Sequence, residues 1–418
     1  DSLVHIPWVI KSLYGIVSDT TPLCGLHRTP YVVIGGVVGA CAFAFLVGMP
    51  THMPMLACTM LALVQFSFAL PDVMVDAVLA EKTRSHPQHA TDLQVLTMGS
   101  FGVCSIVGSM LKGQIFAIAG ARSIFAIGLV TSLVVLPPAV SGWLGEARAS
   151  APERRCALAD VLSPSHPGSG VFKLALVLSA LALALAVTSV ELEATPWVPP
   201  LLSLPVSALV CLACWRYERR VSADLAKASM YAFLQNAMQP SLVVMYKWYK
   251  ATEENCNPLI PIPGVHPLPC FSPQFVGALD VVARGTFLIA LGVYNRYLSS
   301  WRYRSIFATT QLALVVVNLL DLIWVTRLNL SIGMPDTAFA LGAEILQPLV
   351  DRFSLIPLFV LVARLCPAEA QGTAFALNMG LLHLGSNIGS YVGMGILSLL
   401  GGVEPPAFEN IGVLVTIR

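Results

Sequence analysis

Several ionisable residues of this sequence lie inside long apolar segments, where burying a charge is costly. They are Lys11, Asp72, Asp76, Lys112, Asp280, Arg284, Asp321, Glu344, Asp351 and Arg352. Charged side chains at membrane depth usually face a bundle interior or a water-filled cavity, and they often mark a substrate or proton pathway. These residues are therefore the first candidates for substrate binding or proton coupling.

Lys11, Asp72 and Asp76 form the best-defined group among them. Lys11 lies eight residues before Asp19, at the end of its segment, and so about 12 Å deep at the rise of an α-helix. Asp72 and Asp76 lie at a broadly similar depth and, four residues apart, share one helix face. We expect Lys11 to pair with one of them. Such a pair is either a proton-sensitive element lining a cavity or a static lock between two helices.

Arg284 and Arg352 each have an acid nearby, Asp280 at i−4 and Asp351 as a direct neighbour. Arginine holds carboxylates through two parallel hydrogen bonds, which makes both residues candidates for binding a substrate anion. For Asp280 and Arg284 the alternative is an ordinary pair along one helix.

Uncharged polar residues also occur at membrane depth. Gln235, Asn236 and Gln239 precede Pro240 in an apolar segment. They either line a cavity or bond to backbone groups that the proline leaves without partners, and we favour the second interpretation. Asn378, in a glycine-rich segment near the end of the chain, has the same two interpretations.

The composition requires a membrane around these residues. The chain has 418 residues, of which 56% are hydrophobic and 11% charged, and its mean hydropathy is +0.75. Soluble domains carry charge on roughly a quarter of their residues. Segments of about 20 apolar residues span a bilayer as helices. On this template the chain is an all-α, multi-pass membrane protein with about twelve spans, one of them partial, at 2–18, 30–49, 54–80, 92–118, 122–143, 171–190, 195–215, 224–249, 271–297, 303–326, 334–365 and 367–400.

The distribution of Lys and Arg supports this arrangement of spans. When the loop at 18–29 is placed in the cytoplasm, most basic residues fall on the cytoplasmic side. The exceptions are Arg122, Lys247, Lys250 and Arg327. Basic residues concentrate in cytoplasmic loops, so one missed span would have scrambled the pattern.

Two long loops divide the chain. The polar segment 145–170 is typical of a cytoplasmic linker. It predicts an N-terminal helix bundle at 1–144, an additional helix pair at 171–220 and a C-terminal bundle at 221–418. The second loop, 250–270, contains Cys256 and Cys270, which form a disulfide if that side of the membrane is oxidising and otherwise remain free thiols.

Three stretches carry a resemblance to a known family. They are PWVIKSLYGIVSD at 7–19, DVMVDA at 72–77 with Glu81, and ARLCP at 363–367 running on to GTAFAL at 372–377. Gly15, Ser18 and Asp19 followed by Arg28 resemble the loop signature of the major facilitator superfamily. The whole chain resembles the folate–biopterin transporter family. It departs in lacking the first span, in an incomplete last span, and in His27 and Thr29, where the family is richer in arginine. A missing first span would leave the substrate cavity open to lipid, so the fragment is either active like its parent or inactive.

The resemblance implies a transporter of two six-helix bundles with an added helix pair, moving folates or pterins and coupled to protons. A folate offers tail carboxylates, which suit Arg284 or Arg352, and a pterin edge with N–H donors, which suits Asp72 or Asp76. Gly15, Asp19 and Arg28 are expected to form a conformational latch between the bundles, or else to be solvated loop charges.

Other classes of function are disfavoured. The sequence has no nucleophile–base motif, no metal-ligand cluster and no phosphate-binding loop, so we expect no enzyme activity, no cofactor and no metal. Scattered basic residues argue against nucleic acid. We expect a monomer in the plasma membrane or an organelle or plastid envelope. Two alternatives remain: a transporter of another small organic solute, and a nutrient sensor that does not transport.

Overall fold

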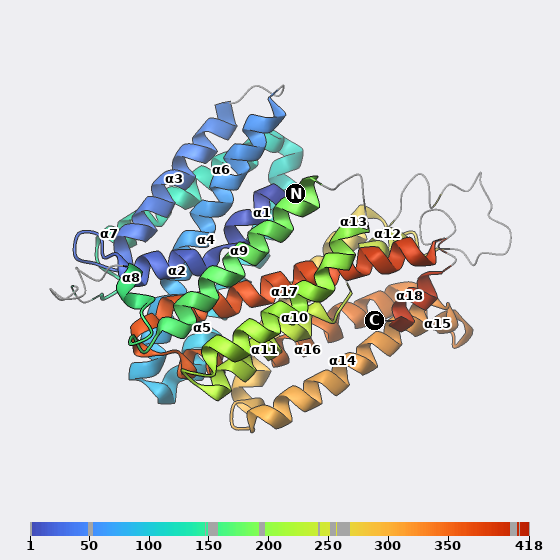
Figure 1. The fold of residues 1–418 in the computed structure, drawn as a ribbon. Coiled ribbons are helices and arrows are strands. Elements are labelled where there is room, and N and C mark those ends of the chain that lie inside the picture. Colours follow the sequence, from blue (N-terminus) through green and yellow to red (C-terminus); the bar gives the residue numbers. More distant parts are fainter. Residues whose placement is uncertain are drawn as a thin grey trace. The chain divides into compact units, whose positions relative to one another are not determined.

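The computed structural model describes residues 2–48, 53–146, 148, 158–191, 197–240, 243–250, 256, 268–401, 408 and 410–417. Helices make up nearly all of this part of the chain (Figure 1). The β-type pairings within it are two isolated bridges, Leu23 with Leu26 and Lys250 with Phe271. The predicted all-α class is confirmed.

Nine helical stretches of the described residues are long and apolar enough to cross a membrane. They overlap α3 (Thr29–Gly48), α4 (Pro54–Ser85), α5 (Ala90–Ala119), α6 (Ala121–Val134) with α7 (Leu136–Val140), α9 (Ser169–Glu191), α10 (Val198–Glu218), α13 (Pro273–Val293), α14 (Tyr303–Val325) and α16 (Asp336–Leu365). Each lies close to a predicted span, because an apolar run of this length buries its backbone polar groups only as a helix.

The other predicted spans correspond to shorter or more polar helices. These are α1 (Ser2–Val9), α2 (Lys11–Thr20), α11 (Ala223–Ala237), α12 (Val243–Tyr249), α17 (Gln371–Leu400) and α18 (Ile411–Ile417). Short turns complete the described helices: α8 (Leu158–Val161), α15 (Leu328–Ser331), η1 (Pro87–His89), η3 (Tyr294–Leu298) and η4 (Ala368–Ala370). The total of about twelve spans stays a prediction.

The chain forms two compact units. Unit 1 consists of Asp1–Ala90, Lys112–Met238 and Leu361–Ile388, and unit 2 of Thr91–Leu111, Gln239–Val360 and Gly389–Arg418. The predicted bundles at 1–144 and 221–418 were defined by the polar segment 145–170, whereas each of these units combines segments from both halves of the chain. The predicted bundles, linker and helix pair therefore stay a prediction.

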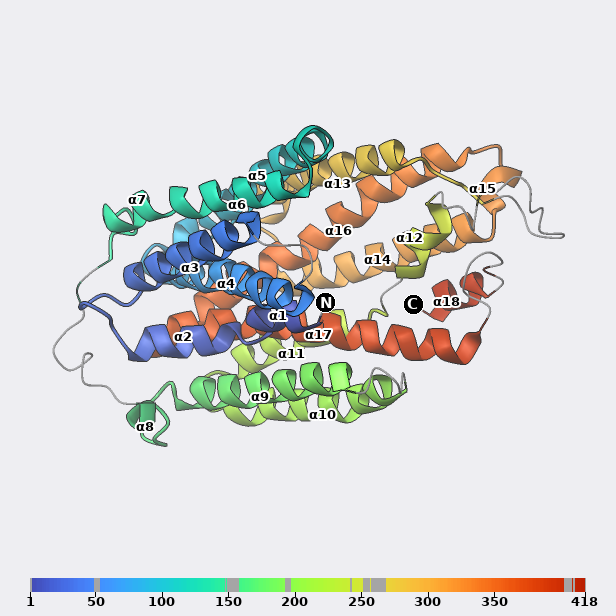
Figure 2. The same ribbon diagram turned by 90° about the horizontal axis from the view of Figure 1, so that it is seen from above.

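In unit 1, α3 packs tightly against α4 and α6. A side chain at Gly39 would place its Cβ 2.6 Å from Ser67 Oγ, and one at Gly35 would lie 2.5 Å from Pro71 Cγ. Glycine is thus what lets α3 approach α4. The helices α9 and α10, in the region of the predicted additional pair, lie side by side (Figure 2). α9 also packs against α1 and α2, and α10 against α11.

Unit 2 has an aromatic core. Trp324 lies 5.4 Å from Trp248 and 5.7 Å from Tyr249 between ring centroids, and Phe271 packs beside them. A disulfide joins Cys256 to Cys270, the residue before Phe271. The disulfide therefore ties Cys256 to the residue that precedes this core.

Candidate functional site

Lys11 is the centre of a charged group in unit 1. It is the first residue of α2, and its side chain is only 2% exposed. It forms an ion pair with Asp72 and lies 3.9 Å from an oxygen of Asp76, both on α4. Its ammonium also lies 5.0 Å from the ring centroid of Trp8, a cation–π contact. The pairing predicted from depth and spacing is present.

This group has the composition of a proton site. One cation faces two carboxylates, so a single proton would neutralise the group. Asp72 is 45% exposed whereas Lys11 is buried, so the group is closed on one side and accessible on the other. Such an arrangement permits exchange of a proton or a ligand at Asp72 without exposing Lys11.

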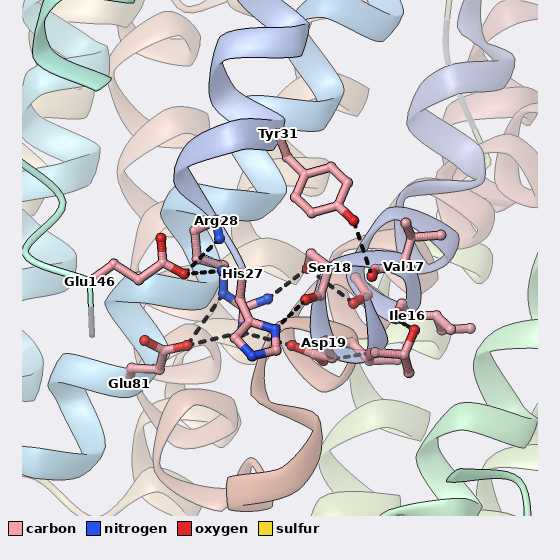
Figure 3. A network of polar contacts seen from close by, with 12 residues as sticks. Ile16, Val17, Ser18, Asp19, His27, Arg28, Tyr31, Glu81 and Glu146 are labelled. Atoms are coloured by element: carbon pink, nitrogen blue, oxygen red, sulfur yellow. Dashed lines mark hydrogen bonds and ion pairs between the residues drawn. The ribbon is translucent and has the colours of Figure 1, made fainter. Parts of the chain in front are cut away.

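Arg28 is the centre of a second network, at the ends of α2, α3 and α4 (Figure 3). Its Nη2 lies 2.7 Å from Asp19 and 2.9 Å from Glu81, and its Nη1 donates to Ser18 Oγ at 2.6 Å. Burial lowers the pKa of this guanidinium, but the ion pairs with Asp19 and Glu81 outweigh burial and raise it above its ordinary value. Arg28 thus stays charged at all physiological pH values.

Asp19 connects this network to the start of α17. Its second oxygen accepts hydrogen bonds from the backbone N–H of Thr373 at 2.8 Å and from the Thr373 hydroxyl at 2.7 Å. Thr373 lies in the first turn of α17, where free N–H groups and the helix dipole favour a carboxylate. Of the predicted latch residues, Gly15 contributes space: a Cβ there would lie 2.7 Å from Thr373 Cα.

Glu146 holds the other side of the network. Its carboxylate accepts from the backbone N–H groups of His27, Arg28 and Thr29 and from the Thr29 hydroxyl, so it caps α3. Glu146 could not be recognised from the sequence, because it lies more than a hundred residues from its partners and no spacing rule links them. Glu81 and Thr373 were recognised only as parts of family stretches.

Unit 2 contains a cavity of about 260 Å³ with charged walls. Its lining residues are Phe101, Gly102, Ser105, Asp280, Ala283, Arg284, Phe287, Pro348, Asp351 and Arg352. Arg284 pairs with Asp280 at 3.1 Å and also donates to Ser105 on α5. The predicted pair along one helix is therefore present, and it lies on a cavity wall. Substrate binding by Arg284 stays a prediction.

Arg352 lines the same cavity but, unlike Arg284, has no ion-pair partner in the described residues. Its guanidinium lies 4.6 Å from the ring centroid of Phe287. Its Nε is buried without a hydrogen-bond partner, and no ion pair joins it to an acid in the described residues. Its neighbour Asp351 accepts instead from Gln347 at 3.1 Å. A guanidinium in this position has donors to offer to a ligand.

The remaining candidates lie elsewhere. Glu344 is half-buried on α16 and does not line the cavity, and the side chain of Lys112 on α5 lies outside the described part. Asn236 donates to the carbonyl of Ala232 in its own helix at 3.3 Å. Asn378 is buried, donates to Ala374 and accepts from Ser229 on α11. Gln235, also on α11, has a polar or ring contact of its own.

A comparison with models of protein families shows the family to which the chain belongs. The model described as the BT1 family matches residues 1–418, the whole length of the chain. The chain belongs to the BT1 family.

Relatives of this BT1 family member are named as folate-biopterin transporters. "Probable folate-biopterin transporter 2" of Arabidopsis thaliana is 25% identical over 419 residues, covering 100% of this chain and 71% of the relative. The "Folate-biopterin transporter" of Synechocystis sp. is 26% identical over 415 residues, covering 98% and 69%. "Probable folate-biopterin transporter 9, chloroplastic" of Arabidopsis thaliana is 22% identical over 414 residues, covering 98% and 66%.

Solved structures of transporters share the fold. The POT family transporter PepTSo aligns with a TM-score of 0.59 at 14% identity, covering 100% of this chain and 83% of its own. The major facilitator proton:xylose symporter XylE aligns with a TM-score of 0.57 at 10% identity, covering 100% and 82%. The BT1 family member therefore has a major-facilitator-type fold. The predicted family, fold class, multi-pass membrane location and transporter rather than enzyme character are confirmed.

Proposed function

We propose that this BT1 family member moves folates or pterins across a membrane by alternating access. The proposal is supported by the names of its relatives and by its fold. The observation that carries the substrate assignment is Arg352. Its guanidinium lies on a cavity wall against Phe287, with a buried Nε that has no partner in the described residues.

A folate tail would complete the bonding of this cavity. Tail carboxylates are planar acceptors that match the fork of a guanidinium. Arg352 offers unused donors, and Arg284 could exchange its bond to Asp280 for one to the ligand. Hydrogen bonds to a charged group contribute about 1.5–3 kcal/mol, which corresponds to roughly a ten- to hundredfold change in affinity. Biopterin, which has no tail carboxylates, would gain none of this.

The test is uptake of labelled folate, methotrexate and biopterin by cells expressing the protein. Arg352→Gln is expected to raise the apparent KM for folate and methotrexate about tenfold or more, and to leave that for biopterin within twofold. Arg304→Gln, an exposed arginine outside the cavity, is the matched control and should change neither. An equal rise for folate and biopterin would refute the assignment of the tail.

Proton coupling is assigned to Lys11, Asp72 and Asp76. Protonation of one carboxylate would neutralise the group and weaken the ion pairs that hold Lys11. Deprotonation would restore the second negative charge and the ion pairs with it. Uptake by the unmodified protein should then increase as the external pH is lowered from 7.5 to 5.5. Asp72→Asn should reduce this pH response, and it should weaken folate and biopterin uptake alike if Asp72 also holds the pterin edge.

The latch formed by Gly15, Asp19 and Arg28 is proposed to hold the start of α17 in one state of the cycle. Asp19 does so through the Thr373 N–H and hydroxyl, with Arg28 keeping the carboxylate oriented. We expect the transporter to act as a monomer. Counterflow in vesicles separates it from a sensor on the same fold, because a sensor binds labelled substrate without exchanging it across the membrane.

A further inference from the structure

The exposed face of α10 has the pattern of a helix that borders lipid. Leu201, Leu204, Leu209 and Leu212 are all exposed and recur at intervals of three to five residues. The buried residues of α10 lie on other faces, where the helix packs against α9 and α11. An apolar face of this kind on a spanning helix is covered by acyl chains.

The same face changes character at the end of the helix. Trp215, Arg216 and Arg219 continue the exposed stripe, and Arg220 follows directly. The Arg219 guanidinium lies 4.9 Å from the ring centroid of Trp215. No ion pair joins any of the three arginines to an acid in the described residues, and the adjacent Glu218 is fully buried. Three positive charges thus lie together, uncompensated, at the end of a spanning helix.

These side chains surround a hollow. It has a volume of about 420 Å³ and is lined by Leu212, Trp215, Arg216, Arg219 and Arg220. A phosphate group accepts bonds from several guanidinium groups at once. The hollow opens at the point where the exposed leucines end, so its apolar and cationic walls are continuous. A ligand that fits both walls has an anionic head and a hydrocarbon chain.

We propose that this hollow binds the phosphate headgroup of an anionic phospholipid, whose acyl chain lies along Leu212, Leu209 and Leu204. Tryptophan at the level of the headgroups and arginine beyond it match the order of a bilayer from core to surface. Each basic residue near an anionic leaflet adds to the attraction between the protein and that leaflet. A soluble phosphate would use the arginines alone and leave the leucine wall without an occupant.

A general preference for positive charge at the membrane surface is the rival explanation, and the chain contains a control for it. Arg296, Arg302 and Arg304 are also exposed, also lie where one spanning helix ends and the next begins, and also have an exposed tryptophan nearby, Trp301. They line neither of the two hollows described here. If charge alone decides, the two arginine triplets are equivalent.

The experiment compares two triple variants, R216Q/R219Q/R220Q and R296Q/R302Q/R304Q, with the unmodified protein. Each is purified in a neutral detergent and titrated with phosphatidylglycerol or with phosphatidylcholine of the same chain length. Bound lipid is counted by native mass spectrometry, and the thermal midpoint is followed in parallel. The unmodified protein and the second variant should retain phosphatidylglycerol at least tenfold better than phosphatidylcholine, whereas the first variant should show no preference.

Three results would overturn the proposal. Equal loss in both variants would assign the effect to charge alone. Equal retention of both lipids by the unmodified protein would show that the hollow does not recognise the anionic headgroup. Displacement of phosphatidylglycerol by millimolar inorganic phosphate would identify a free-anion site. If the first variant is not monodisperse, Arg216→Gln alone replaces it, with an expected loss of about threefold to tenfold in retention, and unchanged retention would refute the site.

Discussion

The latch network of unit 1 and the cavity of unit 2 both contain arginines with acids nearby, yet the two regions differ in how far each charge is satisfied. Arg28 is 4% exposed and bonds to Asp19, Glu81 and Ser18. Arg352 is half-buried, forms no ion pair with an acid in the described residues and leaves its Nε without a partner. The protein thus supplies the hydrogen-bond and ion-pair partners of Arg28 but leaves Arg352 without an ion pair in the described residues.

The contrast separates structural charges from those available to a ligand. A buried charge is tolerated when its partners are present, and removing one partner is strongly destabilising. A group that already has all its partners offers little to a substrate. A group without them gains when a ligand supplies them. If the two regions have their proposed roles, the latch acts through ion pairs and hydrogen bonds within the protein, and the cavity acts through hydrogen bonds that a ligand supplies.

The largest effect should follow from breaking the completed region. Arg28→Ala leaves Asp19 buried beside the start of α17 without its guanidinium, and it should lower the free energy of unfolding by about 3–5 kcal/mol. Denaturant titration in detergent measures this loss. Lys227→Ala is the control: its ion pair with Asp224 is exposed at both ends, and such pairs contribute at most about 1 kcal/mol. Comparable losses in the two variants would contradict the contrast.

Removing the cation of the Lys11 group should destabilise the protein less than Arg28→Ala, because Asp72 in this group is partly exposed. Lys11→Met leaves Asp72 and Asp76 together without a cation, and we expect a loss of about 3 kcal/mol, tempered by the exposure of Asp72. The double variant Lys11→Met/Asp72→Asn removes the orphaned charge and should recover most of that stability. Uptake then decides the role of the pair. If the double variant is stable and still transports fully, the Lys11–Asp72 pair of the unmodified protein is a static lock between two helices.

Local features of the fold were accessible from sequence for a clear reason. A span is set by about 20 consecutive residues, so α3, α9 and α14 begin and end close to the predicted positions. The Lys11–Asp72 pair was also accessible, because depth along a helix is a simple function of residue number. Both inferences use information that lies within one or two segments.

Contacts between distant segments were not accessible. Asp19 and Thr373 are 354 residues apart, and Glu146 lies 117 residues from Thr29. Which helix end meets which carboxylate depends on how the helices pack, and packing in turn depends on positions such as Gly15. The sequence contains these residues, but no periodicity connects them. For the same reason Ser105 was not foreseen as a partner of Arg284.

Gly15 of the latch and Gly372, which lies beside Asp19 and Arg28, should differ in their tolerance of a methyl group. A Cβ at Gly15 would lie 2.7 Å from the Cα of Thr373, a backbone atom that cannot move alone. A Cβ at Gly372 would meet side-chain atoms of Asp19 and Arg28 at 2.9 and 3.0 Å, which can shift. We expect Gly15→Ala to cost about 2 kcal/mol and Gly372→Ala about 1 kcal/mol. The thermal midpoints of the two variants in detergent rank them, and the reverse order would contradict this packing.

The smallest effect separates the two asparagines that have the same pair of interpretations in the sequence. Asn236 donates to its own helix at Ala232, so Asn236→Ala should change the free energy of unfolding by less than about 0.5 kcal/mol. Asn378 is buried and accepts from Ser229, so Asn378→Ala strands that hydroxyl and should cost about 1–2 kcal/mol. Uptake is measured on the same preparations. If Asn236→Ala is as stable as expected but loses folate uptake, its amide binds substrate, and its bond to Ala232 is one that the ligand replaces.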